Sequence, residues 1–241
     1  MTVVESAQRF GATTRTRRTR QWVALIAVGS VVSLAAWVVW FSPLLTVREV
    51  RVLGVTSVSV DLVRQVAAVP AGQPLARVDV SGIGARVGAI PQIAGVEVRR
   101  GWPDVIVVVV TERVPVVVTA TATGYVYVDA TGARFGSLEI APGGMPIVTS
   151  ANATALASAA AVVAALPAPL RATVRSITAR TRDDVVLTLA GGATVQWGSA
   201  DESDRKATVL QALLAVRASS YDVSAPDLPT TRGRLTTSSA P

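Results

Sequence analysis

The chain has 241 residues, a formal net charge of +7, no histidine and no cysteine. These two absences remove the residues on which Ser-His triads, thiol nucleophiles, His or Cys zinc sites and disulfide frameworks depend. The chain also contains a single lysine, Lys206, so a Ser-Lys dyad would have to use that residue. We therefore expect a protein that is not an enzyme and that uses no cofactor or metal.

The positive charge is concentrated at the amino terminus. Residues 1–21 contain five arginines and one acid, Glu5, which leaves 18 basic and 15 acidic residues in the rest of the chain. Because that remainder is nearly neutral, the composition gives no support to nucleic-acid binding.

Residues 22–41 form an uninterrupted run of 20 uncharged, mostly apolar residues. A helix of that length spans the hydrocarbon core of a bilayer, about 30 Å. A signal peptide is the alternative, but its apolar region is usually about 7 to 15 residues long and is followed by small residues. Here the run ends in Trp37, Trp40 and Phe41, and Trp22 stands at its start, as expected for the two interfacial regions of an uncleaved anchor.

Four arginines precede this run and set its predicted orientation: Arg15, Arg17, Arg18 and Arg20. Arginine beside a first membrane span is retained on the cytoplasmic side, where it also lies against anionic lipid head groups. We expect residues 1–21 to form a cytoplasmic tail and the chain from Ser42 onward to be extracytoplasmic. This is the topology of a single-pass type II protein of the cell membrane.

Residues 45–114 predict a compact unit with the order strand, helix, helix, strand, strand. The first strand covers residues 45–52, and the other two cover residues 96–100 and 106–111. Residues 105–110 are apolar at every position, so the third strand should be central in its sheet. The first helix should bury Val58, Leu62, Val66 and Val69, and the second should bury Ile83, Val87 and Ile90 before Pro91 ends it.

Residues 115–229 predict a second, β-rich unit. Strands are expected at residues 116–119, 125–128, 177–181, 185–189 and 193–197. An alanine-rich helix is expected at residues 153–166, and a second helix at residues 204–218 should bury Val209, Leu213 and Val216. A last strand follows at residues 221–225, and residues 230–241 are expected to be a disordered tail. The predicted fold class is α+β.

Several short motifs carry a resemblance to a known family. They are Val50-Arg51-Val52-Leu53-Gly54, Leu75 with Val78-Asp79, Arg100-Gly101-Trp102-Pro103-Asp104, Glu112-Arg113-Val114-Pro115, and Val128-Asp129 with Gly132. The first unit resembles a POTRA domain, and the motifs together resemble the FtsQ/DivIB family of bacterial cell-division proteins.

The resemblance implies a non-enzymatic scaffold of the divisome, located at the division septum. Its implied partners are the FtsB-like and FtsL-like single-pass division proteins. Through them it would act indirectly on the septal peptidoglycan synthase complex.

The last predicted strand is the candidate partner-binding site: Tyr221, Asp222, Val223, Ser224 and Ala225. An edge strand carries unpaired backbone groups, and Pro226 and Pro229 end this strand without covering it. A partner segment can therefore add as a further strand. The family resemblance places a docking edge at the same point.

Two functions from other classes remain as alternatives. A membrane-tethered Ser-Lys hydrolase would need Lys206 buried beside a serine. A POTRA-type transport or chaperone module would pass segments to an outer-membrane barrel, and the many further alternating segments that a barrel needs are not found in this sequence.

Other polar and aromatic motifs favour structural roles. Trp102-Pro103 predicts a turn with a packed indole. Glu112 and Arg113 predict a solvated pair of charges on opposite faces of a strand. The acids at Asp201, Glu202 and Asp204 lie where a helix begins, and there they interact favourably with the helix dipole.

Overall fold

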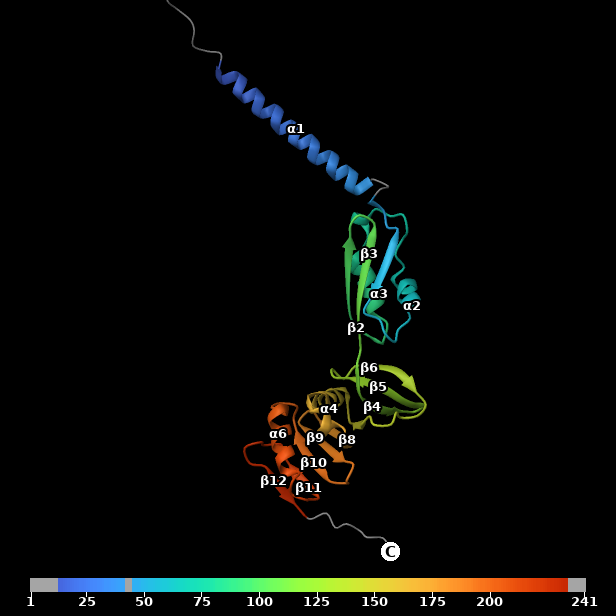
Figure 1. Cartoon of the computed structure of the whole chain (residues 1–241), viewed down its shortest axis with the longest axis vertical. Helices are drawn as coiled ribbons and strands as arrows, with labels where there is room; N and C mark the ends of the chain where they lie inside the picture. The colour runs from blue at the N-terminus through green and yellow to red at the C-terminus, as the bar shows by residue number, and fades with distance from the viewer. Residues whose placement is uncertain (1–12, 42–44, 234–241) are drawn as a thin grey trace, which may run out of the picture. The chain divides into compact units, whose positions relative to one another are not determined.

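The computed structural model describes residues 13–41 and 45–233 of the chain (Figure 1). The predictions made for residues 1–12 and 234–241 lie outside this part. Helix α1 covers Thr13–Phe41, and within it Trp22–Trp40 is long and apolar enough to cross a membrane. The helix therefore begins earlier than the apolar run and includes the positions of Arg15, Arg17, Arg18 and Arg20, whose side chains are outside the description.

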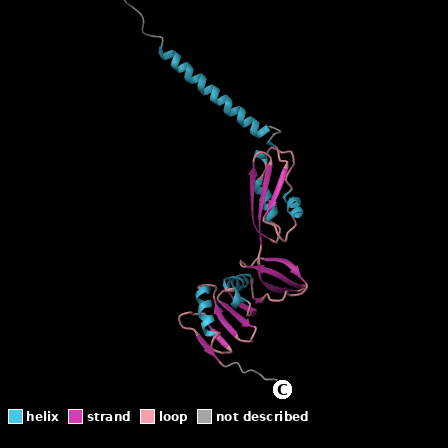
Figure 2. Cartoon of the chain, in the orientation of Figure 1, coloured by secondary structure: helices cyan, strands magenta, loops and turns pink. Residues whose placement is uncertain are grey.

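The rest of the chain forms two units. The first contains Gly95–Val110 together with residues up to Gly88, and the second contains Ala89–Ala94 together with residues from Thr111 onward. Figure 2 shows helices and strands mixed in both units, in agreement with the predicted α+β class.

The first unit has the predicted order of elements. These are β1 (Glu49–Leu53), α2 (Val60–Ala67), the short 3₁₀ helix η2 (Leu75–Arg77), α3 (Val80–Gly88), β2 (Ile93–Gly101) and β3 (Val105–Glu112). The sheet order is β1-β3-β2, so the apolar strand β3 is central as expected. Along β3 the fully buried side chains are those of Ile106, Val108 and Val110, while Val107 and Val109 are half-buried.

The two helices of this unit differ in how well their buried faces were predicted. Helix α3 and the turn after it bury Ile83, Val87 and Ile90, as expected. Helix α2 does not bury its predicted face, because its buried residues are Val63 and Ala67, whereas Leu62 is 44% exposed.

The second unit is built on a nine-stranded sheet with the order β12-β11-β10-β9-β8-β7-β4-β5-β6. Most neighbouring strands are antiparallel, but β4-β7, β7-β8 and β10-β11 are parallel pairs. The strands are β4 (Pro115–Thr121), β5 (Gly124–Asp129), β6 (Arg134–Leu138), β7 (Ile147–Ser150), β8 (Val174–Thr181), β9 (Asp184–Leu189), β10 (Thr194–Gly198), β11 (Ser220–Asp222) and β12 (Thr230–Arg232). Strands β7 and β12 were not expected from the sequence, and no range was predicted for β6.

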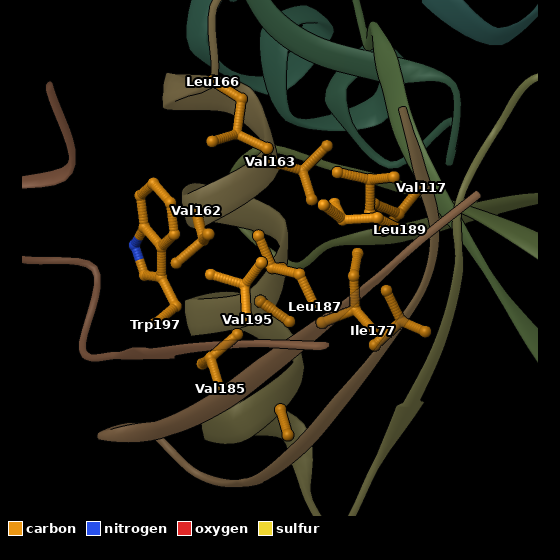
Figure 3. Close-up of a cluster of buried hydrophobic side chains, with 14 of the residues drawn as sticks. Val117, Val162, Val163, Leu166, Ile177, Val185, Leu187, Leu189, Val195 and Trp197 are labelled. Carbon is orange, nitrogen blue, oxygen red and sulfur yellow. The ribbon is translucent and has the colours of Figure 1, made fainter. Parts of the chain in front are cut away.

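Three helices accompany this sheet: α4 (Ala153–Ala165), α5 (Ala168–Arg171) and α6 (Ser203–Leu213). Asn152 caps the amino terminus of α4, and its side chain accepts a hydrogen bond from the Ala155 N–H at 2.9 Å. The apolar residues of α4 pack on the sheet, and Figure 3 shows Val162, Val163 and Leu166 facing side chains from the strands. Those strand residues include Val117, Ile177, Val185, Leu187, Leu189, Val195 and Trp197.

Helix α6 buries a different face from the one predicted. Its buried side chains are Ser203, Lys206, Ala207 and Leu210, whereas Val209 and Leu213 are only partly buried. Val216 lies beyond the end of the helix and is 56% exposed.

Candidate partner-binding edge

The motif residues at the start of the second unit hold its fold together. The Asp129 carboxylate accepts hydrogen bonds from the Thr131 N–H and hydroxyl, at 2.9 and 2.6 Å, and from the Ala133 N–H at 3.0 Å. Its other oxygen accepts a 2.5 Å hydrogen bond from Arg113 Nη1. Arg113 also donates from Nε to the Pro91 carbonyl at 3.0 Å. The expectation that Arg113 is a solvated charge is therefore wrong, because its guanidinium bridges two parts of the unit.

These bonds also set the charge state of Asp129. Burial by itself raises the pKa of this carboxyl, but the hydrogen bonds from Thr131, Arg113 and Ala133 outweigh burial and bring the pKa below its ordinary value. Asp129 is consequently a stable anion. A carboxylate with a lowered pKa suits a structural role and does not suit proton transfer.

Gly132 completes this turn. Its φ is +87°, and a Cβ at this position would lie 2.6 Å from the Ala157 Cα in α4. Because only glycine fits both the backbone conformation and the contact, the turn after β5 can pack closely on α4.

The motif residues of the first unit are structural as well. Arg100 donates from Nε to the Leu75 carbonyl at 2.9 Å and from Nη2 to the Val78 carbonyl at 2.7 Å. Gly54 has φ +83°, and a Cβ there would lie 2.1 Å from the Val110 carbonyl oxygen. The residues that carry the family resemblance therefore build the fold.

The predicted docking strand is an inner strand. Strand β11 (Ser220–Asp222) pairs with β10 on one side and with β12 on the other, so Tyr221 and Asp222 do not form the uncovered edge that was expected of residues 221–225. Tyr221 is 3% exposed and Val223 is fully buried, and the Val223 N–H donates to the Gln196 carbonyl at 3.0 Å. Asp222 accepts bonds from the Ser224 N–H and hydroxyl. Ala225 accepts from the Leu228 N–H in the loop that follows.

The strand at the edge is β12, which the sequence analysis placed in a disordered tail. Its register on β11 is Ser220 with Arg232, Tyr221 with Thr231, and Asp222 with Thr230. All three β12 residues are exposed, and the described residues place no strand on its far side. The signal that sequence analysis missed is a short pair of β-branched residues, Thr230 and Thr231, directly after Pro229.

The hydrogen bonds around β11 show which way the β12 backbone points. The Ser219 carbonyl accepts from the Thr194 N–H and the Val223 N–H donates to β10, so the Ser220 N–H and the Asp222 carbonyl face β12. Their register partners, Arg232 and Thr230, therefore pair inward. It follows that the N–H and C=O of Thr231 point away from the sheet.

An ion pair holds the loop between β11 and β12 to helix α6. The Arg205 guanidinium binds the Asp227 carboxylate and also contacts Glu202. The hydrogen bond to Asp227, followed by that to Glu202, raises the pKa of Arg205. Leu228, next to Asp227, is 79% exposed. An exposed charge pair thus connects the loop before β12 to α6.

Lys206 is buried, but it does not contact a serine hydroxyl. Its Nζ donates to the Ser199 carbonyl at 2.9 Å, and burial lowers the pKa of its ammonium. The nearby Ser203 hydroxyl donates to the Ala200 carbonyl and accepts from Trp197 Nε1. Burial is the one condition of the Ser-Lys alternative that is met. The serine contact on which the chemistry depends is not formed in the described residues.

The turn between β2 and β3 presents an aromatic side chain to solvent. Trp102 is 53% exposed, so the expectation of a packed indole is wrong. An exposed tryptophan is a frequent partner contact.

A helix long and apolar enough to cross a membrane, followed by a strand-helix-helix-strand-strand unit and a β-rich unit, defines a protein of the POTRA class. A family model described as "POTRA domain, FtsQ-type" matches residues 45–113. A second, described as "Cell division protein FtsQ/DivIB, C-terminal", matches residues 117–228. The two matches together cover most of the chain.

Curated relatives agree with these matches. The chain is 37% identical over 227 residues to the cell division protein FtsQ of Streptomyces bingchenggensis, with 88% of this chain and 86% of that protein covered. It is 34% identical to FtsQ of Mycolicibacterium smegmatis, where the match covers 91% of this chain and 66% of the relative. A solved domain of DivIB from Geobacillus stearothermophilus is similar with a TM-score of 0.36, 19% identity, and coverage of 44% of this chain and 93% of that one. The chain belongs to the FtsQ/DivIB family of cell division proteins.

Proposed function

We propose that this chain is a non-enzymatic scaffold of the bacterial divisome that recruits and regulates FtsB-like and FtsL-like single-pass division proteins. Through them it acts on septal peptidoglycan synthesis. Its amino terminus lies in the cytoplasm, and its two folded units lie outside the membrane at the septum. Family membership supports the division role, and the arginines before the membrane-spanning helix support the orientation.

The observation that carries the recruiting role is the edge of β12, which no strand within residues 45–233 covers. Thr231 directs a backbone donor and acceptor away from the sheet. Strand β12 itself contains no proline and no acidic residue, and its single charged residue is Arg232. Such an edge can pair with a strand of a partner protein. Main-chain hydrogen bonds then supply the affinity, and every second side chain supplies the specificity. We therefore propose residues 230–232, in place of residues 221–225, as the docking strand.

The test is a proline scan of β12 in the full-length protein. Thr231→Pro removes the outward donor and leaves the inward bonds of Thr230 and Arg232 in place. We expect this variant to fold normally and to bind the FtsB-like and FtsL-like pair at least about tenfold more weakly, because a main-chain bond is lost and the ring blocks the approaching strand. Binding is measured by co-purification and by recruitment of the labelled pair to the septum.

Two matched variants distinguish the contribution of the backbone N–H groups of β12 to partner binding from that of the side chains. Thr231→Ala keeps the donor and should bind within a few-fold of wild type. Thr230→Pro removes an inward donor and should release β12 from β11. Normal recruitment by a folded Thr231→Pro variant would show that the partner does not use this edge.

A further inference from the structure

Three surface hollows lie at one end of the strands of the β-rich unit, and the third reaches Tyr221 of β11, the residue that pairs with Thr231 of β12. Their volumes are about 310, 470 and 410 Å³. The first and second share Gly144, Met145 and Ala172 in their linings, and the second and third share Ala190. Neighbouring hollows thus share lining residues, and we name the three together the triple hollow.

Each part of the triple hollow is lined by one arginine: Arg171, Arg175 and Arg217 in turn. None of the three guanidinium groups makes an ion pair or a side-chain hydrogen bond within residues 45–233. No acidic side chain lines any of the three parts. The surface consequently holds positive charge without a counter-charge.

The arginines at the opposite end of the same sheet behave differently. Arg180, near the end of β8, pairs with Asp184 at 3.7 Å, and Arg182 pairs with Asp183 at 3.2 Å. Arg175 lies at the start of that same strand and has no such partner. Along β8, the unpaired charge thus lies at the start of the strand, whereas the paired charges lie at and just beyond its end.

The third part of the triple hollow adds an apolar floor. It is lined by Leu189, Ala193, Leu214 and Tyr221, with Arg217 among them. The Tyr221 hydroxyl is already used, since it donates to the Val216 carbonyl and accepts from the Ala218 N–H. The tyrosine therefore offers the apolar part of its ring to this hollow, and a volume of about 410 Å³ has room for a large apolar side chain.

Glycines keep the surface open. Gly143 lines the first part and Gly191 lines the third, and a Cβ built on either of them would meet nothing within 4 Å. Neither residue has a positive φ, so larger residues are sterically permitted at both positions.

We propose that the triple hollow is a docking surface for an acidic segment of a partner protein, one that carries a large apolar side chain among its carboxylates. The apolar side chain enters the third part, and the carboxylates pair with Arg175 and Arg217. Charge complementarity of this kind speeds association and excludes partners of the wrong sign.

Other classes of ligand fit this surface less well. A membrane surface is bound by apolar side chains that project from the protein, whereas the apolar residues here line a recess. Single-stranded nucleic acid is bound on exposed aromatic faces beside the cations, and the only aromatic in the linings is the buried Tyr221.

A random 12-residue peptide display library, panned against the full-length protein in phosphatidylcholine nanodiscs, tests the proposal without presupposing a sequence. Each round includes counter-selection against the Arg175→Glu/Arg217→Glu variant. We expect the enriched peptides to combine Asp or Glu with Leu, Phe or Trp. The selected peptides should bind Arg217→Glu at least about tenfold more weakly than wild type, as measured by fluorescence anisotropy.

Matched variants locate the binding. Gly191→Asp places a negative charge at the rim and should also weaken binding, whereas Gly191→Asn has the same size and should not. Arg180→Glu makes the same charge change at the other end of β8 and should leave binding unchanged. Thr231→Pro should also leave it unchanged, which separates this surface from the β12 edge. Circular dichroism melting confirms that each variant is folded.

Three outcomes would overturn the proposal. One is enrichment of neutral or basic peptides, and another is no enrichment over the counter-selected variant. The third is that phosphatidylglycerol vesicles bind wild type but not Arg175→Glu/Arg217→Glu while no acidic peptide is selected, which would assign the surface to lipid.

Discussion

Asp129 and Arg113 show how a charge pair becomes part of a fold. Both oxygens of the carboxylate are bonded, and the arginine that binds one of them also holds the Pro91 carbonyl. Removing one partner from such a buried pair costs several kcal/mol, because the other charge is left without compensation. Sequence analysis singled out both residues as motif members, but it could not pair them, because local spacing says nothing about a contact across 16 positions.

The Asp129 carboxyl makes the stability of the β-rich unit dependent on pH. Its pKa in the folded protein lies below the unfolded value of about 3.9, so it contributes stability that is fully present above that value. This contribution is lost as the pH falls through the folded pKa. We expect Asp129→Asn to be less stable than wild type at pH 7 and to lose less stability than wild type between about pH 5 and pH 2.

Urea unfolding at a series of pH values, followed by the fluorescence of the buried Trp197, measures this difference. Asp204→Asn is the control, since that exposed carboxylate lies in the first turn of α6 and accepts no side-chain hydrogen bond in the described residues. Parallel pH curves for Asp129→Asn and wild type would mean that Asp129 is not the group responsible.

At the scale of elements, helices and strands were predicted correctly where the hydrophobic pattern of the sequence matches the observed burial. Strand β3 is apolar throughout and is central, and α4 is alanine-rich and lies in the main core. Predictions of the buried face failed for α2 and α6. In α6, Lys206 lies on the buried face because its ammonium reaches the Ser199 carbonyl, and a charged residue is not expected there from polarity alone. Strand β12 was missed because three exposed residues carry no hydrophobic pattern.

The two faces of β3 should tolerate a buried charge differently. Val108 is fully buried and Val109 is half-buried on the opposite face. An unpaired carboxylate at Val108 has no solvent access, so we expect Val108→Asp to lower stability by more than about 4 kcal/mol and to unfold the first unit. Val109→Asp should cost less, because its carboxylate can reach water from the half-buried face.

Circular dichroism melting and protein abundance in cells compare the two variants. Val108→Ala and Val109→Ala serve as size controls without charge. Equal melting temperatures for the two aspartate variants would contradict the assignment of a single fully buried face.

At the scale of the whole molecule, α1 separates the basic amino terminus from the two folded units along the chain. The proposed orientation has a direct consequence for protease accessibility. Protease added to spheroplasts should digest the folded units and leave a small membrane-bound fragment that contains the amino terminus. Arg15, Arg17, Arg18 and Arg20 changed together to glutamate should reduce or invert this pattern.

Immunoblotting with an amino-terminal tag reads out the fragment, and a cytoplasmic protein monitors spheroplast integrity. A mature, soluble protein that starts near residue 40 would instead identify a cleaved signal peptide. Protection of the folded units in intact spheroplasts would place them in the cytoplasm.

The way in which β12 is attached has a thermodynamic consequence. Three residue pairs and an exposed Arg205-Asp227 ion pair hold this strand, and none of its own side chains is buried. Its local opening therefore costs far less free energy than unfolding of the unit as a whole. A partner that binds only the paired form stabilises that form by mass action, by about 2.7 kcal/mol at a free concentration one hundred times its dissociation constant. Partner binding and the pairing of β12 with the sheet are then a single linked equilibrium. Strand β12 opens more readily in the free protein than in the partner-bound protein.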